Sequence, residues 1–185
     1  MVGLEDGSLN AMSPGETALH EAGHAVAHVR LDIQQTGVSI KPVPEQGRLG
    51  AVNAEGIENV WDAEGAQAQV LAYCAGYAAL IAVGLEEARA VEGADDDFDS
   101  AVELIESWGL DGTIEIWKQR AVSMMQEPRN LLAVRTVAER LERDGSLDDQ
   151  WIDMLVDLAD GEISSKEFER FVAFRAHMEC RSRTV

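Results

Sequence analysis

The spacing of apolar and polar residues divides the chain into helix-length segments separated by short polar or glycine-containing breaks. Within these segments apolar residues recur every three or four positions, which is the period of an amphipathic α-helix. Two shorter runs, 38–40 and 49–52, are bounded by glycine and proline and favour strands. The predicted helices span residues 14–31, 61–83, 94–108, 114–125, 129–143, 147–159 and 164–181. The pattern therefore predicts a mainly α protein with a small β element.

Individual residues refine the predicted start of the first helix, the loop between the strands and the second helix. Ser13 and Glu16 have capping-box spacing, and Pro14 occupies the first helical position, where its missing N–H costs nothing. The segment 42–47 contains two prolines and a glycine, so it is predicted to be a loop between the two strands. Residues 65–85 carry no charge but are rich in alanine and glycine and contain two glutamines, so we expect a buried helix and no membrane insertion.

The length of 185 residues suits one hydrophobic core. We expect a flexible N-terminal arm at residues 1–12, a main domain at 13–160 and a C-terminal helical extension at 161–185. In the extension, apolar residues at helical spacing suggest docking on the domain or on another subunit; they are Phe168, Phe171, Val172 and Phe174.

The net charge of the chain limits the kinds of molecule that it can bind. The chain has 15 basic and 34 acidic residues and a net charge of −19. Residues 1–110 hold 19 acidic and 4 basic residues (net −15), and residues 111–185 hold 15 and 11 (net −4). Such a surface repels phosphate backbones and anionic membranes, so we expect no nucleic-acid partner. The acidic half either attracts metal ions or basic peptide segments, or serves solubility alone.

Cys74 and Cys180 are too few and too far apart for a disulfide framework. The N-terminus has neither the basic segment nor the apolar segment of a signal peptide. We therefore expect buried free thiols in a reducing compartment, the cytoplasm.

The predicted first helix contains the sequence His20-Glu21-Ala22-Gly23-His24, an HExxH motif. Residues i and i+4 lie on one face of a helix, so both imidazoles can bind one Zn²⁺ ion. Glu21 can accept a proton from an activated water and later donate it to the leaving amine. With four histidines in the chain, a chance match has a probability of about one in a hundred.

A catalytic zinc site needs a third protein ligand. His28 would lie about 12 Å from His20 along an unbroken helix, so we reject it, and His177 is too distant in sequence to assign. The ligand should therefore be a carboxylate, and the acidic cluster within 93–101 is the candidate segment. Part of that cluster also matches an EF-hand calcium loop, but Ser100 replaces the required glycine and the apolar spacing is helical.

The HExxH segment and the acidic segment together resemble a known protein family. His20-Glu21-Ala22-Gly23-His24-Ala25-Val26 resembles the active-site helix of the FtsH peptidase domain, the M41 metallopeptidases. Residues 93–101 resemble the family segment Gly-Ala-x-x-Asp-hydrophobic-x-x-Ala, which supplies an aspartate as third zinc ligand. This resemblance implies that Asp97 completes the site. Weaker similarity extends over about residues 16–156, with Gly76 matching the glycine of the family's second helix.

The resemblance implies a zincin-type HExxH helix in an FtsH-peptidase-like helical bundle, with residues 13–160 as the zinc peptidase domain. The sequence departs from the family in two places. Leu80-Ile81 stand where its second helix carries a glutamate, and no GxxxxGK[ST] motif of its ATPase module occurs. We therefore expect an ATP-independent peptidase that cleaves peptides or unfolded segments. The family forms hexameric rings, so a homo-oligomer and an unfoldase acting in trans remain open as partners.

The expected mechanism is zinc-dependent endopeptidase chemistry. His20, His24 and Asp97 would bind Zn²⁺, and Glu21 would be the general base and then the general acid. The strand near Val38–Lys41 would pair with an extended substrate. Tyr77 is either a core residue or an oxyanion donor. Two alternatives remain: a non-catalytic, metal-stabilised regulatory module with the same fold, and a helical interaction protein with a coincidental motif.

Overall fold

The computed structural model describes residues 12–41, 51–54 and 62–182. These residues are mainly helical with a small antiparallel sheet, which confirms the predicted fold class. None of the helices in these ranges has both the length and the apolar character needed to cross a bilayer. The elements are α1 (Pro14–Arg30), β1 (Gln35–Ser39), β2 (Ala51–Ala54), α2 (Ala63–Ala82), α3 (Glu87–Val91), α4 (Asp95–Trp108), α5 (Ile114–Met125), α6 (Pro128–Asp144), β3 (Ser146–Asp148), α7 (Asp149–Asp160) and α8 (Ser165–Ser182).

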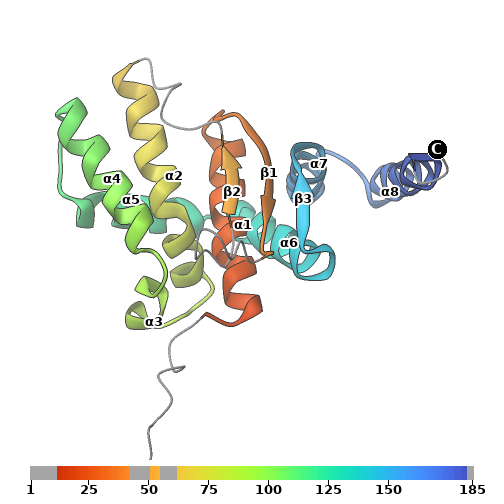
Figure 1. The fold of residues 1–185 in the computed structure, drawn as a ribbon, viewed down its shortest axis with the longest axis horizontal. Helices are drawn as coiled ribbons and strands as arrows, with labels where there is room; N and C mark the ends of the chain where they lie inside the picture. Colours follow the sequence, from red (N-terminus) through yellow and green to blue (C-terminus); the bar gives the residue numbers. More distant parts are fainter. Residues whose placement is uncertain (1–11, 42–50, 55–61, 183–185) are drawn as a thin grey trace, which may run out of the picture.

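Helix α1 lies at the centre of the fold (Figure 1). On one side it packs against α2, which in turn packs against α4 and α5. On the other side it packs against α6, which pairs with α7. The sheet lies beside α1, and α8 extends outward at the opposite end of the molecule from α4 (Figure 1). This arrangement surrounds the HExxH helix with other elements and buries most of it.

The interface between α1 and α2 is built from small residues. A Cβ at Gly23 would lie 2.5 Å from the Ala75 carbonyl oxygen and 2.6 Å from the Ala79 Cβ, closer than real contacts allow. Only glycine at this position permits the observed approach of the two helices. As the sequence predicted, α2 is buried over most of its surface. The small residues therefore bring the backbone of α2 close to the histidine face of α1.

The sheet has the order β2-β1-β3, with both pairings antiparallel. The strand predicted at 38–40 is observed at Gln35–Ser39, so it begins three residues earlier and ends one residue earlier. The strand predicted at 49–52 is observed as Ala51–Ala54, with residues 49 and 50 outside the described ranges. Strand β3 was not predicted, because residues 147 and 148 were assigned to a helix. Three residues carry too little pattern to indicate a strand; β3 forms because the tertiary fold places it beside β1.

The remaining differences concern helix ends. Asp148 caps α7 by accepting a hydrogen bond from the Trp151 N–H at 3.0 Å, so this helix begins at Asp149 and not at residue 147. Helix α3 was missed because it is only five residues long. The segment compared with a calcium loop is helical in α4, which excludes that alternative.

The structure also bears on the predicted arm and extension. Met12, assigned to the arm, is half-buried against the core, and residues 1–11 lie outside the described ranges. Helix α8 docks through aromatic contacts, with the Trp151 and Phe171 rings 4.7 Å apart between centroids. Three of the four apolar residues named above pack against the domain, whereas Phe174 is 60% exposed.

The predicted capping box at the start of α1 is confirmed and extended by an ion pair. The Ser13 N–H donates to Glu16 Oε2 at 2.6 Å, and Arg89 of α3 donates to both Glu16 oxygens at 2.8 and 3.0 Å. The hydrogen bonds from Arg89, followed by those from Ser13, lower the pKa of Glu16 to about 2. Glu16 therefore ties α3 to the first turn of the HExxH helix.

We expect Glu16→Ala to lower the free energy of unfolding by about 1 kcal/mol through loss of the cap. Because the folded-state pKa of Glu16 is depressed, its contribution is present above pH 4.5 and disappears as the pH falls toward 2. Urea unfolding at pH 7 and pH 3 measures both effects. An equal stability difference between the two proteins at both pH values would contradict this assignment.

Candidate metal centre

Three side chains from two helices converge on one point. His20 and His24 of α1 place their Nε2 atoms 3.0 Å apart, and Asp97 Oδ2 of α4 lies 3.1 and 3.2 Å from them. Ligands at about 2.0–2.1 Å from a tetrahedral zinc are roughly 3.3 Å apart, so the three atoms match one face of such a site. The structure thus brings together the three residues that the sequence analysis named, from positions more than 70 residues apart.

The hydrogen bonding of His24 leaves its Nε2 atom as the one that can bind a metal. Its Nδ1 lies 2.7 Å from the Ala72 carbonyl oxygen, which can only accept, so Nδ1 carries the proton. In neutral His24 the Nε2 atom then presents a lone pair to the lone pairs of Asp97 and His20. Either a metal ion held by the three atoms or a proton shared with the Asp97 carboxylate removes this repulsion. The residues therefore fit a divalent metal, with Ala72 orienting one ligand.

Gly76 of α2 makes room for both imidazoles. A Cβ at this position would lie 2.4 Å from His24 Nε2 and 2.6 Å from His20 Nε2. Any other residue would therefore place a carbon atom against the ligand nitrogens. Gly76 matches the glycine in the second helix of the family that the sequence resembles, and the structure supplies the steric reason for glycine there.

The position of Asp97 follows from the packing of α4. The neighbouring Phe98 packs edge-to-face on Tyr77 of α2, with ring centroids 5.5 Å apart. The Lys118 Nζ of α5 lies over both rings, 4.6 Å from the Phe98 centroid and 4.8 Å from the Tyr77 centroid. These contacts hold the first turn of α4 against α2, which directs Asp97 toward the histidines.

Glu21 lies beside the two histidines on α1 and is 8% exposed. Its negative charge contributes, after that of Asp97, to raising the pKa of His24. A buried carboxylate next to a set of metal ligands is the arrangement that a general base requires.

The charges of the centre stabilise one another. Burial alone would lower the pKa of His24, but the Asp97 carboxylate and then Glu21 raise it to about 9. Burial alone would raise the pKa of Asp97, but His24 and His20 hold it far below its usual range. Without a metal, the centre therefore holds a proton between an imidazole and a carboxylate.

This electrostatic balance predicts opposite pH dependences for the metal-free and metal-loaded protein. The raised pKa of His24 stabilises the metal-free fold fully below pH 6.5, and this stabilisation is lost as the pH rises through 9. Zinc must displace the proton, so its affinity should rise about tenfold per pH unit in this window. Thermal unfolding of chelated and zinc-loaded protein from pH 6 to pH 9 tests this. A zinc-induced rise in Tm that shrinks with pH would count against it.

The other residues considered as metal ligands or as an oxyanion donor are not part of the metal-ligand group. His28 is buried one turn beyond His24 with a pKa lowered to about 4, mainly by burial, and it does not join the ligands. His177 is exposed on α8. The Tyr77 hydroxyl points to Glu87 Oε1 at 3.4 Å, which favours the packing role over the oxyanion role. Burial and then the charge of Asp97 raise the pKa of Tyr73, which lies one turn before Gly76 on α2.

The prediction about the two cysteines is half right. Both are free, and Cys74 is buried, which raises the pKa of its thiol to about 12. Cys180 lies exposed on α8, so the expectation of two buried thiols is wrong for this residue.

The expectation that Val38–Lys41 pairs with substrate is also wrong. Residues 37–39 of β1 are hydrogen-bonded on one side to β2 and on the other to β3, so β1 is the central strand. Position 37 requires glycine, with φ of +148° and space for no Cβ against the Leu147 carbonyl. Among the described strands, β2 and β3 lie at the edges of the sheet, and β2 contacts α1.

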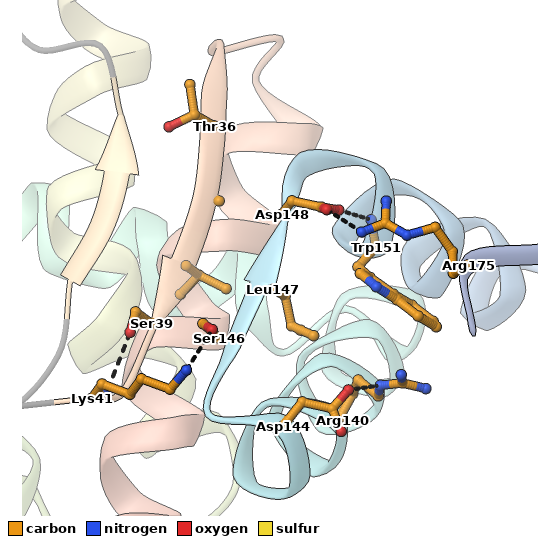
Figure 2. A pocket seen from close by; sticks show the side chains of 12 residues that line it. Thr36, Ser39, Lys41, Arg140, Asp144, Ser146, Leu147, Asp148, Trp151 and Arg175 are labelled. Carbon is orange, nitrogen blue, oxygen red and sulfur yellow. Dashed lines mark hydrogen bonds and ion pairs between the residues drawn. The ribbon is translucent and has the colours of Figure 1, made fainter. Parts of the chain in front are cut away.

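A hollow of about 760 Å³ lies apart from the metal centre, between β1 and β3 on one side and α6, α7 and α8 on the other (Figure 2). Its cations already have partners: Arg140 pairs with Asp144, Arg175 with Asp148, and Lys41 with the Ser146 hydroxyl (Figure 2). This hollow contains none of the proposed metal ligands.

Comparison with protein-family models and with curated proteins finds no match for this chain. The function of the protein is therefore inferred from the geometry of His20, His24 and Asp97 and from the position of Glu21.

Proposed function

We propose that this protein is a zinc-dependent metalloendopeptidase that cleaves peptides or unfolded segments without ATP. The observation that carries the proposal is the convergence of His20, His24 and Asp97 within 3.2 Å of one another. The HExxH spacing supports it by placing Glu21 next to this group on the same helix. Zinc fits the mixture of imidazole and carboxylate ligands better than calcium or magnesium, which prefer oxygen.

The chain's own residues would perform the remaining steps. A zinc ion bound to the triad supplies a Lewis acid for the attacking water and the scissile carbonyl. The Glu21 carboxylate takes the water proton and later delivers it to the leaving amine nitrogen. The Ala72 carbonyl keeps the proton on His24 Nδ1 and so leaves Nε2 as the ligand atom.

An extended substrate would pair with the outer edge of β2 and not with β1. Strand β2 is at the edge of the sheet and contacts the helix that carries the histidines. Pairing there would hold the peptide beside α1 by main-chain hydrogen bonds, which suits unfolded segments of varied sequence. The 185 residues contain no phosphate-binding loop, in keeping with cleavage of chains that are already unfolded.

The test begins with the metal content of the purified full chain. We expect about one zinc ion per chain by elemental analysis, lost or sharply weakened in His24→Ala and in Asp97→Ala. The matched control is Asp95→Ala, which removes an exposed aspartate two positions away in the same turn of α4 and should keep the metal. A wild-type protein that binds no zinc after reconstitution would overturn the metal site.

The second step is cleavage of an unfolded protein such as casein by the zinc-loaded chain without ATP. We expect cleavage that chelation abolishes and zinc restores. Zinc binding with no cleavage of casein would instead favour the non-catalytic, metal-stabilised module. Absence of both zinc binding and casein cleavage would favour a helical interaction protein with a coincidental HExxH motif.

A further inference from the structure

The three metal ligands differ in exposure, and this shows from which side a substrate reaches them. The side chains of His20 and His24 are 5% and 10% exposed, whereas that of Asp97 is 27% exposed. The centre is therefore open toward α4. A substrate segment that reaches the ligands past Asp97 lies against this side of α4.

That side of α4 is acidic. Asp96, Ser100 and Glu103 follow one another at helical spacing, and both acids are exposed. Helices α2 and α4 pack against each other. The pKa of Tyr73 on α2 is raised first by burial and then by the charges of Asp97 and Glu103. Tyr73 is half-buried and lies one turn before Gly76, on the face of α2 that covers the histidines. Tyr73 and the acidic row therefore flank the same approach.

Nothing on these two helices neutralises the acids. Neither α2 nor α4 contains a lysine or arginine. Of the cations on adjoining helices, Lys118 lies over the rings of Tyr77 and Phe98, and Arg89 is paired with Glu16 and Glu92. Within the described residues, Asp96 and Glu103 also belong to no group with metal-binding spacing. Arg120 of α5 lies over the Trp117 ring. Among the described residues, Asp96 and Glu103 therefore have no assigned cationic partner and are open to a cationic ligand.

We propose that the substrate of this centre is a cationic, flexible peptide segment, whose lysine or arginine side chains lie against Asp96 and Glu103. The inference rests on the proposed peptidase function and specifies its substrate class. Two such contacts between exposed charges change affinity by roughly tenfold. The net charge of −15 on residues 1–110 adds long-range attraction for the same substrates.

The experiment uses the zinc-loaded full chain and three fluorogenic peptides of equal length. They share one cleavable core and differ in flanking residues, which are lysine, glutamine or glutamate. At low salt we expect kcat/KM to be at least about tenfold higher for the lysine peptide than for the glutamate peptide. At about 300 mM salt this ratio should shrink several-fold, because screening weakens exposed charge pairs. Equal kcat/KM for all three peptides at low salt would overturn the inference.

Two double variants locate the effect. Asp96→Asn with Glu103→Gln should reduce the lysine-to-glutamate ratio to about threefold. The control, Glu139→Gln with Glu169→Gln, also removes two negative charges, but from exposed positions on α6 and α8. It should leave the lysine-to-glutamate ratio of kcat/KM unchanged. A similar loss of preference in both double variants would overturn the role of the acidic row on α4.

A binding assay separates this inference from the proposed function. The Glu21→Gln variant with zinc should bind the lysine peptide more tightly than the glutamate peptide in fluorescence anisotropy, without turnover. If no peptide is cleaved by the wild type, the peptidase proposal fails, whereas the binding difference still tests the charge preference. Equal Kd values for both peptides would contradict the preference whatever the activity.

Discussion

Replacing Glu21 with glutamine is expected to lower kcat/KM for peptide cleavage by about 10²–10⁴-fold while leaving the zinc content unchanged. The amide keeps the size of the carboxylate and can still form hydrogen bonds, but it cannot accept the water proton. Because Glu21 is not among the converging ligand atoms, the metal should remain bound. Elemental analysis and initial rates on one fluorogenic peptide measure the two quantities together.

The control for this variant is Glu139→Gln, the same change at an exposed position on α6. It should retain wild-type rates, which would show that the loss belongs to position 21. Full activity of Glu21→Gln with a full complement of zinc would remove Glu21 from the mechanism. Loss of zinc together with activity would instead show that Glu21 supports the metal site.

The second large effect is expected at Gly76. In Gly76→Ala the new methyl group would lie 2.4 Å from His24 Nε2 and 2.6 Å from His20 Nε2, so the imidazoles must move. The ligand atoms now lie within 3.2 Å of one another, and their displacement should weaken zinc binding by at least about 100-fold. Chelator competition measures the affinity, and circular dichroism shows whether the helices persist.

Gly65→Ala is the matched control because it makes the same change in the same helix. A Cβ there meets only Asp62 Oδ1, at 3.4 Å, so the methyl group is accommodated. Alanine is the better helix former, and we expect unchanged zinc affinity in this variant. Wild-type zinc affinity in Gly76→Ala would mean that α2 can shift away from the histidines, and that the close approach at Gly76 does not define the site.

The amino-acid sequence alone determined the helical parts of this protein. The capping box around Pro14 and the period of apolar residues placed α1, α5 and α8 within about one residue of their observed ends. These signals are local, since a cap or an amphipathic stripe lies within a few turns of one helix. The HExxH motif is equally local, because i and i+4 share a helix face in any fold. His20, Glu21 and His24 could therefore be named before the fold was known.

The tertiary structure alone decided the features that depend on distant segments. Strand β3 exists because residues 146–148 lie beside β1, and that pairing made β1 a central strand that cannot accept substrate. The sequence offered three neighbouring aspartates, and the resemblance singled out Asp97, but only the packing of α4 on α2 places its oxygen within 3.2 Å of both histidines. The requirement for glycine at position 76 and the opening of the centre toward α4 likewise arise where separate helices meet. Such contacts depend on packing between elements, which no short stretch of sequence encodes by itself.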